Sequence, residues 1–217
     1  MRLSNFKIQR IGYLVLGALL FVTGCTPNNT LHQYSFNTAI INYTVTGSSD
    51  GTVKLTIKGD TSAREAHVIF HKTTGDEKQD NLTIDNGKTI TSIDLNKKIG
   101  STTVNPDYEN LNKLDPSQRQ EYLKKSAIGY SPDDALSQLT QEVKLVGHTK
   151  IADQRCEIYI TVGFGQTCLW NAIPLRTTIA LLNLHSDTVA TSVVIDPNVD
   201  DKIFQIPPDI KITNNLP

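Results

Sequence analysis

Apolar and polar residues alternate along most of the chain, and this two-residue period predicts β-strands with one apolar side. Residues 41–45 (INYTV) alternate in this way, and residues 52–58 (TVKLTIK) do so again after the glycine-containing turn GSSDG. Such a pair of segments is typical of an antiparallel hairpin that is buried on one face. The pattern therefore predicts a sheet whose apolar face must be covered.

The same pattern continues towards both ends of the chain. The turn Asp85-Asn86-Gly87 between two alternating segments is a strong hairpin signal, because asparagine and glycine adopt the positive φ angles that tight turns require. Further strands are predicted at residues 65–72, 81–84, 88–95, 97–104, 143–151, 155–161, 164–170, 177–184, 190–195 and 203–206.

Two short helices are predicted in the middle of the chain. Asp115 is an N-cap candidate followed by Pro116 and by Gln118 at the capping-box position, and the helix is expected to end near Ser126. Ser131-Pro132-Asp133-Asp134 repeats the arrangement, and apolar residues then recur at helical spacing as far as Val143. The fold class is therefore mainly β with α (α+β): one strongly curved antiparallel sheet with two short helices covering its concave face.

The N-terminus has the pattern of an export signal. Arg2, Lys7 and Arg10 precede an apolar run of 12 residues from Ile11 to Val22, which is shorter than the roughly 20 residues that span a bilayer. The run ends in V-T-G-C, which resembles the lipobox of bacterial lipoproteins. This resemblance implies attachment of diacylglycerol to the Cys25 thiol, cleavage after Gly24 and acylation of the new amino group.

The lipobox divides the chain into three parts and implies a location. Residues 1–24 are the lipoprotein signal peptide, residues 25–35 are the lipidated cysteine with a polar tether, and residues 36–217 are the folded domain. Several acyl chains hold a protein at a membrane more firmly than one chain does. Thr26 stands where an aspartate would indicate retention in the inner membrane. We therefore expect the outer membrane, facing the periplasm, in a host with two membranes, and otherwise the outer face of the cell membrane.

Charge excludes one class of partner. The formal net charge of the whole chain is −1, and loss of the three positive charges of the signal makes it about −4. A mildly acidic chain without basic clusters argues against nucleic acid as a partner. Membrane attachment is expected through the acyl chains on Cys25 instead.

Two cysteines remain in the exported part, Cys156 and Cys168, and an even number in an exported chain favours a disulfide. The segment RCEIYITVGFGQTCLW places them symmetrically about a glycine-containing turn at residues 161–163. If Ile158 lies opposite Gln166, Cys156 lies directly opposite Cys168 on one face of a hairpin. The sequence therefore predicts a structural disulfide.

No catalytic or metal-binding motif is found, so we expect a protein that is not an enzyme and uses no cofactor. His67 and His71 have the helical spacing of zinc ligands, but they lie in a predicted strand, where four residues span about 13 Å. Gly87-Lys88-Thr89 ends like a phosphate loop but lacks the glycine five positions earlier. Trp170, beside a disulfide, is expected to be a core residue. No residue is assigned as catalytic, cofactor-binding or metal-binding.

Short motifs occur along the chain between about residues 40 and 210. Their residues are Tyr43, Gly47, Gly51, Ile57, Asp94, Lys97, Lys98, Gly100, Ile151, Ala152, Cys156, Tyr159, Cys168, Trp170, Ile173, Pro174, Leu175, Phe204, Ile206 and Pro207. Through these residues the chain resembles the exported bacterial lipoproteins that share the LolA/LolB-like half-barrel. The resemblance implies an unclosed antiparallel barrel wrapped over helices, a fold that often encloses a hydrophobic cavity for acyl chains.

Two functions remain open at this point. The first is a membrane-anchored, non-enzymatic lipoprotein whose half-barrel binds a lipid or another apolar ligand. The alternative is a structural or protein-interaction lipoprotein of the envelope with a filled core and no small ligand. The sequence names neither a ligand nor a protein partner.

Overall fold

The computed structural model describes residues 34–128, 143–163, 165–181 and 184–214. The predicted signal peptide, Cys25 and the predicted helix that begins near Ser131 lie outside these residues. The three-part division of the chain and the lipidation of Cys25 therefore stay predictions.

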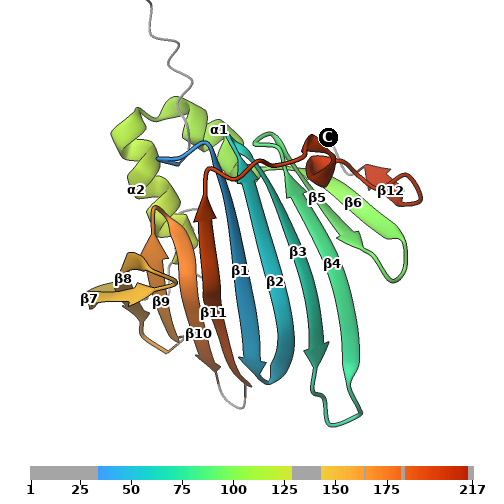
Figure 1. Ribbon diagram of the computed structural model, residues 1–217, viewed down its shortest axis with the longest axis horizontal. Coiled ribbons are helices and arrows are strands. Elements are labelled where there is room, and N and C mark those ends of the chain that lie inside the picture. Colours follow the sequence, from blue (N-terminus) through green and yellow to red (C-terminus); the bar gives the residue numbers. More distant parts are fainter. Residues whose placement is uncertain (1–33, 129–142, 164, 182–183, 215–217) are drawn as a thin grey trace, which may run out of the picture. The chain divides into compact units, whose positions relative to one another are not determined.

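The described strands form one sheet of 12 strands (Figure 1), whose edge strands β12 and β7 do not pair with each other. The sheet is curved and unclosed, and it is accompanied by two short helices. Its order is β12-β6-β5-β4-β3-β2-β1-β11-β10-β9-β8-β7. The strands are β1 (Thr38–Gly47), β2 (Ser49–Lys58), β3 (Thr61–Phe70), β4 (Glu77–Asp85), β5 (Thr89–Asp94), β6 (Ile99–Val104), β7 (Val143–Ile151), β8 (Gln154–Thr161), β9 (Gly165–Trp170), β10 (Ile173–Leu181), β11 (Leu184–Ile195) and β12 (Lys211–Asn214).

The sheet is built from two antiparallel meanders joined by one ladder. Strands β1 to β6 run outwards in chain order to one edge, and β7 to β11 run inwards from the other edge. The ladder between β1 and β11 unites them, although it pairs residues about 150 positions apart, such as Ile41 with Val193. A bulge lies between Asn42 and Tyr43.

Side-chain hydrogen bonds reinforce this ladder. The Asn42 Nδ2 atom donates to Ser192 Oγ at 2.8 Å, and Thr191 Oγ1 donates to the Asn42 carbonyl at 3.1 Å. At the end of the ladder, Thr38 Oγ1 donates to the Pro197 carbonyl at 2.9 Å. These bonds satisfy polar groups at the bulge that the regular ladder leaves unpaired.

The main hydrophobic core lies on one side of this junction. By register, Ala39, Ile41, Ile57 and Leu55 point to the same side of β1 and β2. Ile41 and Ile57 have no exposed surface, and Leu175 of β10 is equally buried in the same core. Each such side chain contributes about 1.5–3 kcal/mol when it leaves water, so this cluster dominates the stabilisation of the sheet.

A second core lies on the opposite side of the sheet, over strands β2 to β6 of the first meander. Thr56, Ala63, Ile84, Thr91 and Thr102 are opposite one another in successive ladders, and all are buried. The hydroxyl groups of Thr91 and Thr102 share a hydrogen bond of 3.0 Å, which allows their burial. Strand alternation predicted a single apolar face, but the buried face changes between β2 and β4.

The C-terminal segment covers this second core. A short 3-10 helix, η2 (Asp201–Phe204), contacts β3, and Ile203 and Pro207 line a small cavity with Ala63 and Leu82. Lys58 forms an ion pair with Asp201 at the same place. The prediction of a strand at residues 203–206 was therefore wrong. This segment packs onto a face of the sheet and does not join an edge.

Two helices lie between β6 and β7 in the described chain: α1 (Pro106–Lys113) and α2 (Pro116–Ala127). The second confirms the predicted capping box, because the Asp115 carboxylate accepts from the Gln118 backbone while the Gln118 side chain accepts from the Asp115 backbone. Tyr122 of α2 donates to Asp107 of α1 at 2.6 Å, which ties the helices together.

The first helix was missed by the sequence prediction. Asn105 is its N-cap and accepts a hydrogen bond from the Asp107 backbone at 3.0 Å, and Pro106 occupies the first turn. The start of α2 has the same kind of signal, an N-cap aspartate followed by a proline.

Two further sheet predictions were wrong. Residues 177–184 were predicted as one strand, but β10 ends at Leu181 and β11 begins at Leu184, so the chain reverses there. The sheet was predicted as fully antiparallel, but β12 pairs with β6 in parallel, with Lys211 opposite Ile99. The chain crosses the sheet through η2 before it reaches β12, so this last strand runs in the same direction as β6.

Cys156 and Cys168 form the predicted disulfide, with their Cα atoms 5.4 Å apart. The register of the hairpin differs from the prediction by two residues, because Ile158 lies opposite Cys168. A shift of two residues keeps the same side chains on the same face, so the cysteines meet as diagonal neighbours. Gly163, the glycine of the predicted turn, has a positive φ of +83° in the loop between the two strands.

Removal of this disulfide is expected to destabilise the domain. Replacing both Cys156 and Cys168 with Ala should lower the free energy of unfolding by roughly 3 kcal/mol, because a closed loop of this length restricts the unfolded chain. Guanidinium unfolding of protein lacking residues 1–25 measures the change. Thr149→Ala, at an exposed position opposite Cys156 in the β7–β8 ladder, is the matched control. Equal midpoints for the double variant and the unsubstituted protein would contradict the prediction.

Candidate binding site

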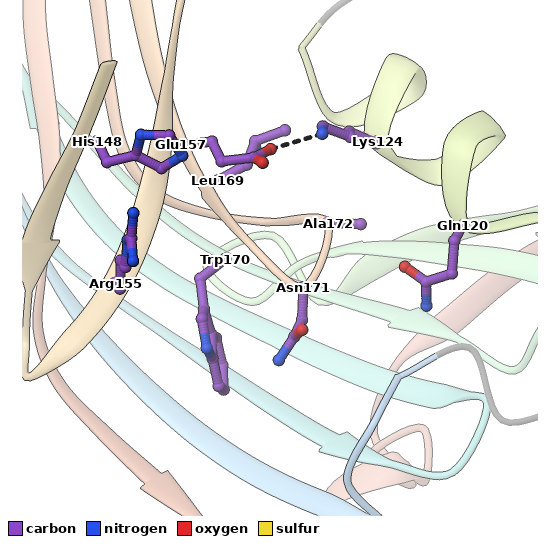
Figure 2. Close-up of a pocket in the computed structure, with 9 residues that line it drawn as sticks. All are labelled: Gln120, Lys124, His148, Arg155, Glu157, Leu169, Trp170, Asn171 and Ala172. Carbon is purple, nitrogen blue, oxygen red and sulfur yellow. Dashed lines mark ion pairs between the residues drawn. The ribbon is translucent and has the colours of Figure 1, made fainter. Parts of the chain in front are cut away.

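A pocket of about 430 Å³ lies between α2 and the second meander (Figure 2). Helix α2 contributes two side chains, β7 contributes one, and the rest come from β8, β9 and the turn into β10. The lining residues are Gln120, Lys124, His148, Arg155, Glu157, Leu169, Trp170, Asn171 and Ala172. Charged and polar groups make up most of this wall, so the pocket suits a polar ligand better than an acyl chain.

An ion pair joins the helix to the sheet across this pocket. Lys124 Nζ lies 2.5 Å from Glu157 Oε2, and the hydroxyl group of Tyr159 donates to the same oxygen at 2.6 Å. The ammonium group also lies 5.2 Å from the centre of the Tyr159 ring. The hydrogen bond from Lys124, and after it that from Tyr159, lowers the pKa of Glu157. This carboxylate therefore stays ionised and fixes α2 against β8.

Two more basic side chains face the pocket from the sheet, His148 of β7 and Arg155 of β8, and both are exposed. Within the part of the chain that the structure describes, no carboxylate pairs with the Arg155 guanidinium group. The neighbouring Lys150 pairs with Asp153 at 2.9 Å instead. Arg155 is therefore the cation of this pocket that stays available to a ligand.

Two tight turns hold the ends of the pocket in place. Asn171 and Ala172, between β9 and β10, have φ angles of +48° and +61°, and Ala152 and Asp153, between β7 and β8, have +46° and +64°. Two consecutive positive φ angles are typical of the type I′ turn, which usually contains asparagine or glycine. An alanine there costs about 1 kcal/mol or more, so the surrounding packing must stabilise these turns.

A stack of three aromatic rings connects the pocket to the beginning of the described chain. Tyr34 stacks on Phe36 with centroids 5.4 Å apart, and Phe36 stacks on Trp170 at 5.3 Å. Trp170 was expected in the core. It is half-buried, because it packs against the core through Phe36 and also lines the pocket. Residues 34–36, which follow the predicted tether, are thus fixed beside the pocket.

The disulfide lies on the other face of the same hairpin. By register, Cys156, Ile158 and Cys168 share one face of β8 and β9, whereas Glu157, Tyr159 and Leu169 share the other. The disulfide therefore lies behind the pocket and joins β8, which carries Arg155 and Glu157, to β9.

Two other cavities occur among the described residues. A shallow one of about 900 Å³ lies over β3 to β6 and β12, with polar side chains such as Arg64, Asn81 and Asp94 in its wall. A smaller one of about 220 Å³ lies under η2 and contains Lys54 and Glu65. Both walls contain charged side chains, which an acyl chain would leave without a hydrogen-bond partner.

The two histidines singled out in the sequence have separate partners. His67 Nδ1 lies 2.9 Å from Asp80, and its Nε2 lies 3.2 Å from Glu65. His71 lies 3.0 Å from both Asp76 and Asp50. No cluster of three or more metal-ligating side chains is found among the residues described.

The sequence indicated only part of this pocket. Of the lining residues, Trp170 was singled out, as an expected core residue, but Lys124, Arg155 and Glu157 were not. The disulfide behind the pocket was predicted. Single charged residues in a strand or helix carry no motif, and they become a site only when α2 lies against β8. Between residues 34 and 214, in the parts that the structure describes, none of the helices has the length and apolar character needed to cross a membrane.

The fold and the pocket define an unclosed half-barrel domain with a polar cleft between sheet and helix. A family model described as "Predicted periplasmic protein (DUF2092)" matches residues 25–167, and the chain belongs to this family. No curated protein matches the sequence.

Comparison with solved structures finds similar chains at low sequence identity. A conserved protein from Thermus thermophilus is similar in fold, with 9% identity and a TM-score of 0.50 over 83% of this chain and 92% of the other. The Pseudomonas aeruginosa MucA/MucB complex contains a chain that is 12% identical with a TM-score of 0.41, over 85% of this chain and 59% of the other. This chain therefore spans a little more than half the length of that neighbour.

The carboxylate partners of the histidines predict a pH effect. Hydrogen bonds to Asp76 and then to Asp50 raise the pKa of His71, and the bond to Asp80 raises that of His67. A histidine with a raised pKa stabilises the fold fully below its unfolded pKa of about 6.5, and this contribution is lost as pH rises through the folded pKa.

Asp76→Asn should lower the pKa of His71 and leave that of His67 unchanged, so His67 serves as the internal control. Titration of the imidazole signals by NMR measures both values. An unaltered His71 titration in the variant would show that Asp76 is not its partner in solution.

Proposed function

We propose that the protein is a non-enzymatic binding lipoprotein of the envelope, anchored by acyl chains on Cys25, whose half-barrel domain binds another protein. The observation that carries this proposal is the filled core. Ile41, Ile57, Ile173 and Leu175 are at most 2% exposed and belong to one cluster of packed side chains. The apolar side of the central strands is thus covered by the domain's own side chains, and the open pocket beside it is polar.

The lipid-binding alternative is less well supported. A pocket for an acyl chain needs a wall of mainly apolar side chains. Each of the three cavities described above contains charged groups in its wall, including Lys124 and Glu157 in one, Arg64 and Asp94 in another, and Lys54 in the third. Leu145 and Val146 are exposed apolar residues of the edge strand β7, where they are available to a protein partner.

The anchor would keep the binding domain close to the membrane. Tyr34 lies nine positions after Cys25, and a fully extended chain over this interval reaches about 30 Å. The aromatic stack of Tyr34, Phe36 and Trp170 then connects the tether directly to the pocket. A partner in the pocket would thus be held within reach of the membrane surface.

Replacement of the lipobox cysteine tests the anchor. Cys25→Ser should leave an unprocessed precursor that takes up no fatty acid, because only the thiolate at this position accepts the diacylglyceryl group. Metabolic labelling with an alkyne fatty acid, followed by gel mobility, measures both changes. Cys156→Ser is the matched control and should be labelled normally. Normal labelling of Cys25→Ser would contradict the anchor.

A photo-crosslinking residue on β7 tests the protein partner. With the crosslinker at Val146, which is 53% exposed, we expect reproducible capture of one envelope protein in the native host. The crosslinker at Ile99, 48% exposed on β6, is the control for the far part of the sheet. The captured protein should then bind the purified domain in a defined complex.

Native mass spectrometry of protein lacking residues 1–25 separates the two functions. Ligand-free spectra agree with the protein-binding role. A co-purifying lipid at one molecule per domain, without a protein that binds the purified domain, would overturn the proposal.

A further inference from the structure

In the pocket of Figure 2, the guanidinium group of Arg155 has no carboxylate partner among the residues that the structure describes. Lys124 and Glu157 neutralise each other at 2.5 Å. The guanidinium group of Arg155 then adds a positive charge to the pocket wall. A single unpaired guanidinium group matches a monoanion such as a carboxylate, whose two oxygens it binds through two parallel hydrogen bonds.

The position of Arg155 is fixed from two sides. The next residue, Cys156, is held by the disulfide to β9, and the turn at Ala152 and Asp153 begins just before β8. The strand backbone under the guanidinium group is therefore pre-organised, which lowers the conformational cost of binding.

The pocket also opens onto an edge strand. His148 lines the pocket and belongs to β7, which pairs only with β8 among the described strands. The side chains of Leu145 and Val146 on this strand are 52% and 53% exposed. An edge strand with apolar side chains offers backbone and side-chain contacts to an extended peptide.

We propose that this pocket binds a carboxylate side chain of an extended acidic peptide segment, with Arg155 as the anchoring cation and β7 as the strand beside which the segment lies. The inference rests on the proposed protein-binding function and names the chemistry of its partner. Glu157 disfavours a dianion such as phosphate, because its carboxylate lines the same pocket.

Trp170 provides a direct signal for this site, because it is the only tryptophan of the chain and lines the pocket. The probe is a blocked seven-residue peptide of alternating valine and glutamate, titrated into protein lacking residues 1–25 at constant ionic strength. We expect a saturable change in tryptophan fluorescence. The matched peptide with glutamine in place of glutamate should bind roughly tenfold more weakly, as expected for loss of a charge-assisted hydrogen-bond pair.

Variants of Arg155 test its role. Arg155→Gln should raise the Kd for the glutamate peptide roughly tenfold, and Arg155→Lys should raise it by a few fold, since an ammonium group keeps the charge but not the paired geometry. Arg64→Gln, which removes an exposed arginine of β3 outside this pocket, should change the Kd by less than about twofold. Circular dichroism and the thermal midpoint confirm that each variant is folded.

Several results would overturn the inference. These are equal affinity for the glutamate and glutamine peptides, an unchanged Kd for Arg155→Gln, or a response to inorganic phosphate or glucuronate as strong as that to the peptide. If the protein captured at Val146 binds Arg155→Gln as well as the unsubstituted domain, the inference fails and the proposed function stands. If no protein binds the domain at all, the proposed function fails and the inference fails with it.

Discussion

The pairing of β1 with β11 is the constraint on which the rest of the structure depends. It is the only ladder between the two meanders of the described chain, and it joins residues about 150 positions apart. The most deeply buried side chains, including Ala39, Ile41 and Leu175, gather around it. Until this ladder forms, each meander has an unpaired central edge and an uncovered apolar face. Such long-range pairing couples the two halves, so the core and the pocket form in one cooperative structure.

The pocket follows from the way the second meander is held. The disulfide, two tight turns with positive φ angles and the stack of Phe36 on Trp170 all act on strands β7 to β10. The Lys124–Glu157 pair then attaches α2 to this rigid part. A disulfide is consistent with a family described as periplasmic, because thiols are readily oxidised outside the cytoplasm. The result is a cleft in which Arg155 pairs with no carboxylate of the described residues, and the proposal of an acidic partner rests on this charge.

Local signals predicted the elements that depend on neighbouring residues. The capping box at Asp115 and the Asp85-Asn86-Gly87 turn are both present, because their hydrogen bonds lie within a few residues of chain. The same kind of signal at Asn105 and Pro106 was available and was missed. The reversal after Leu181 was not predicted, because the run TTIALLNL contains neither glycine nor proline to mark a turn. The two-residue error in the cysteine hairpin arose because the pattern gives the face of each side chain but not the loop length.

The sequence by itself determined the mainly β character, the cysteine pair that forms a disulfide and the start of α2, since each depends on periodicity or on contacts close in sequence. Only the tertiary structure decided which side of each strand is buried. That side changes between β2 and β4, because the C-terminal segment around η2 returns to cover the opposite face. It also decided the binding pocket, because Lys124, Arg155 and Trp170 come from separate segments and acquire a common role only when α2 packs against the second meander.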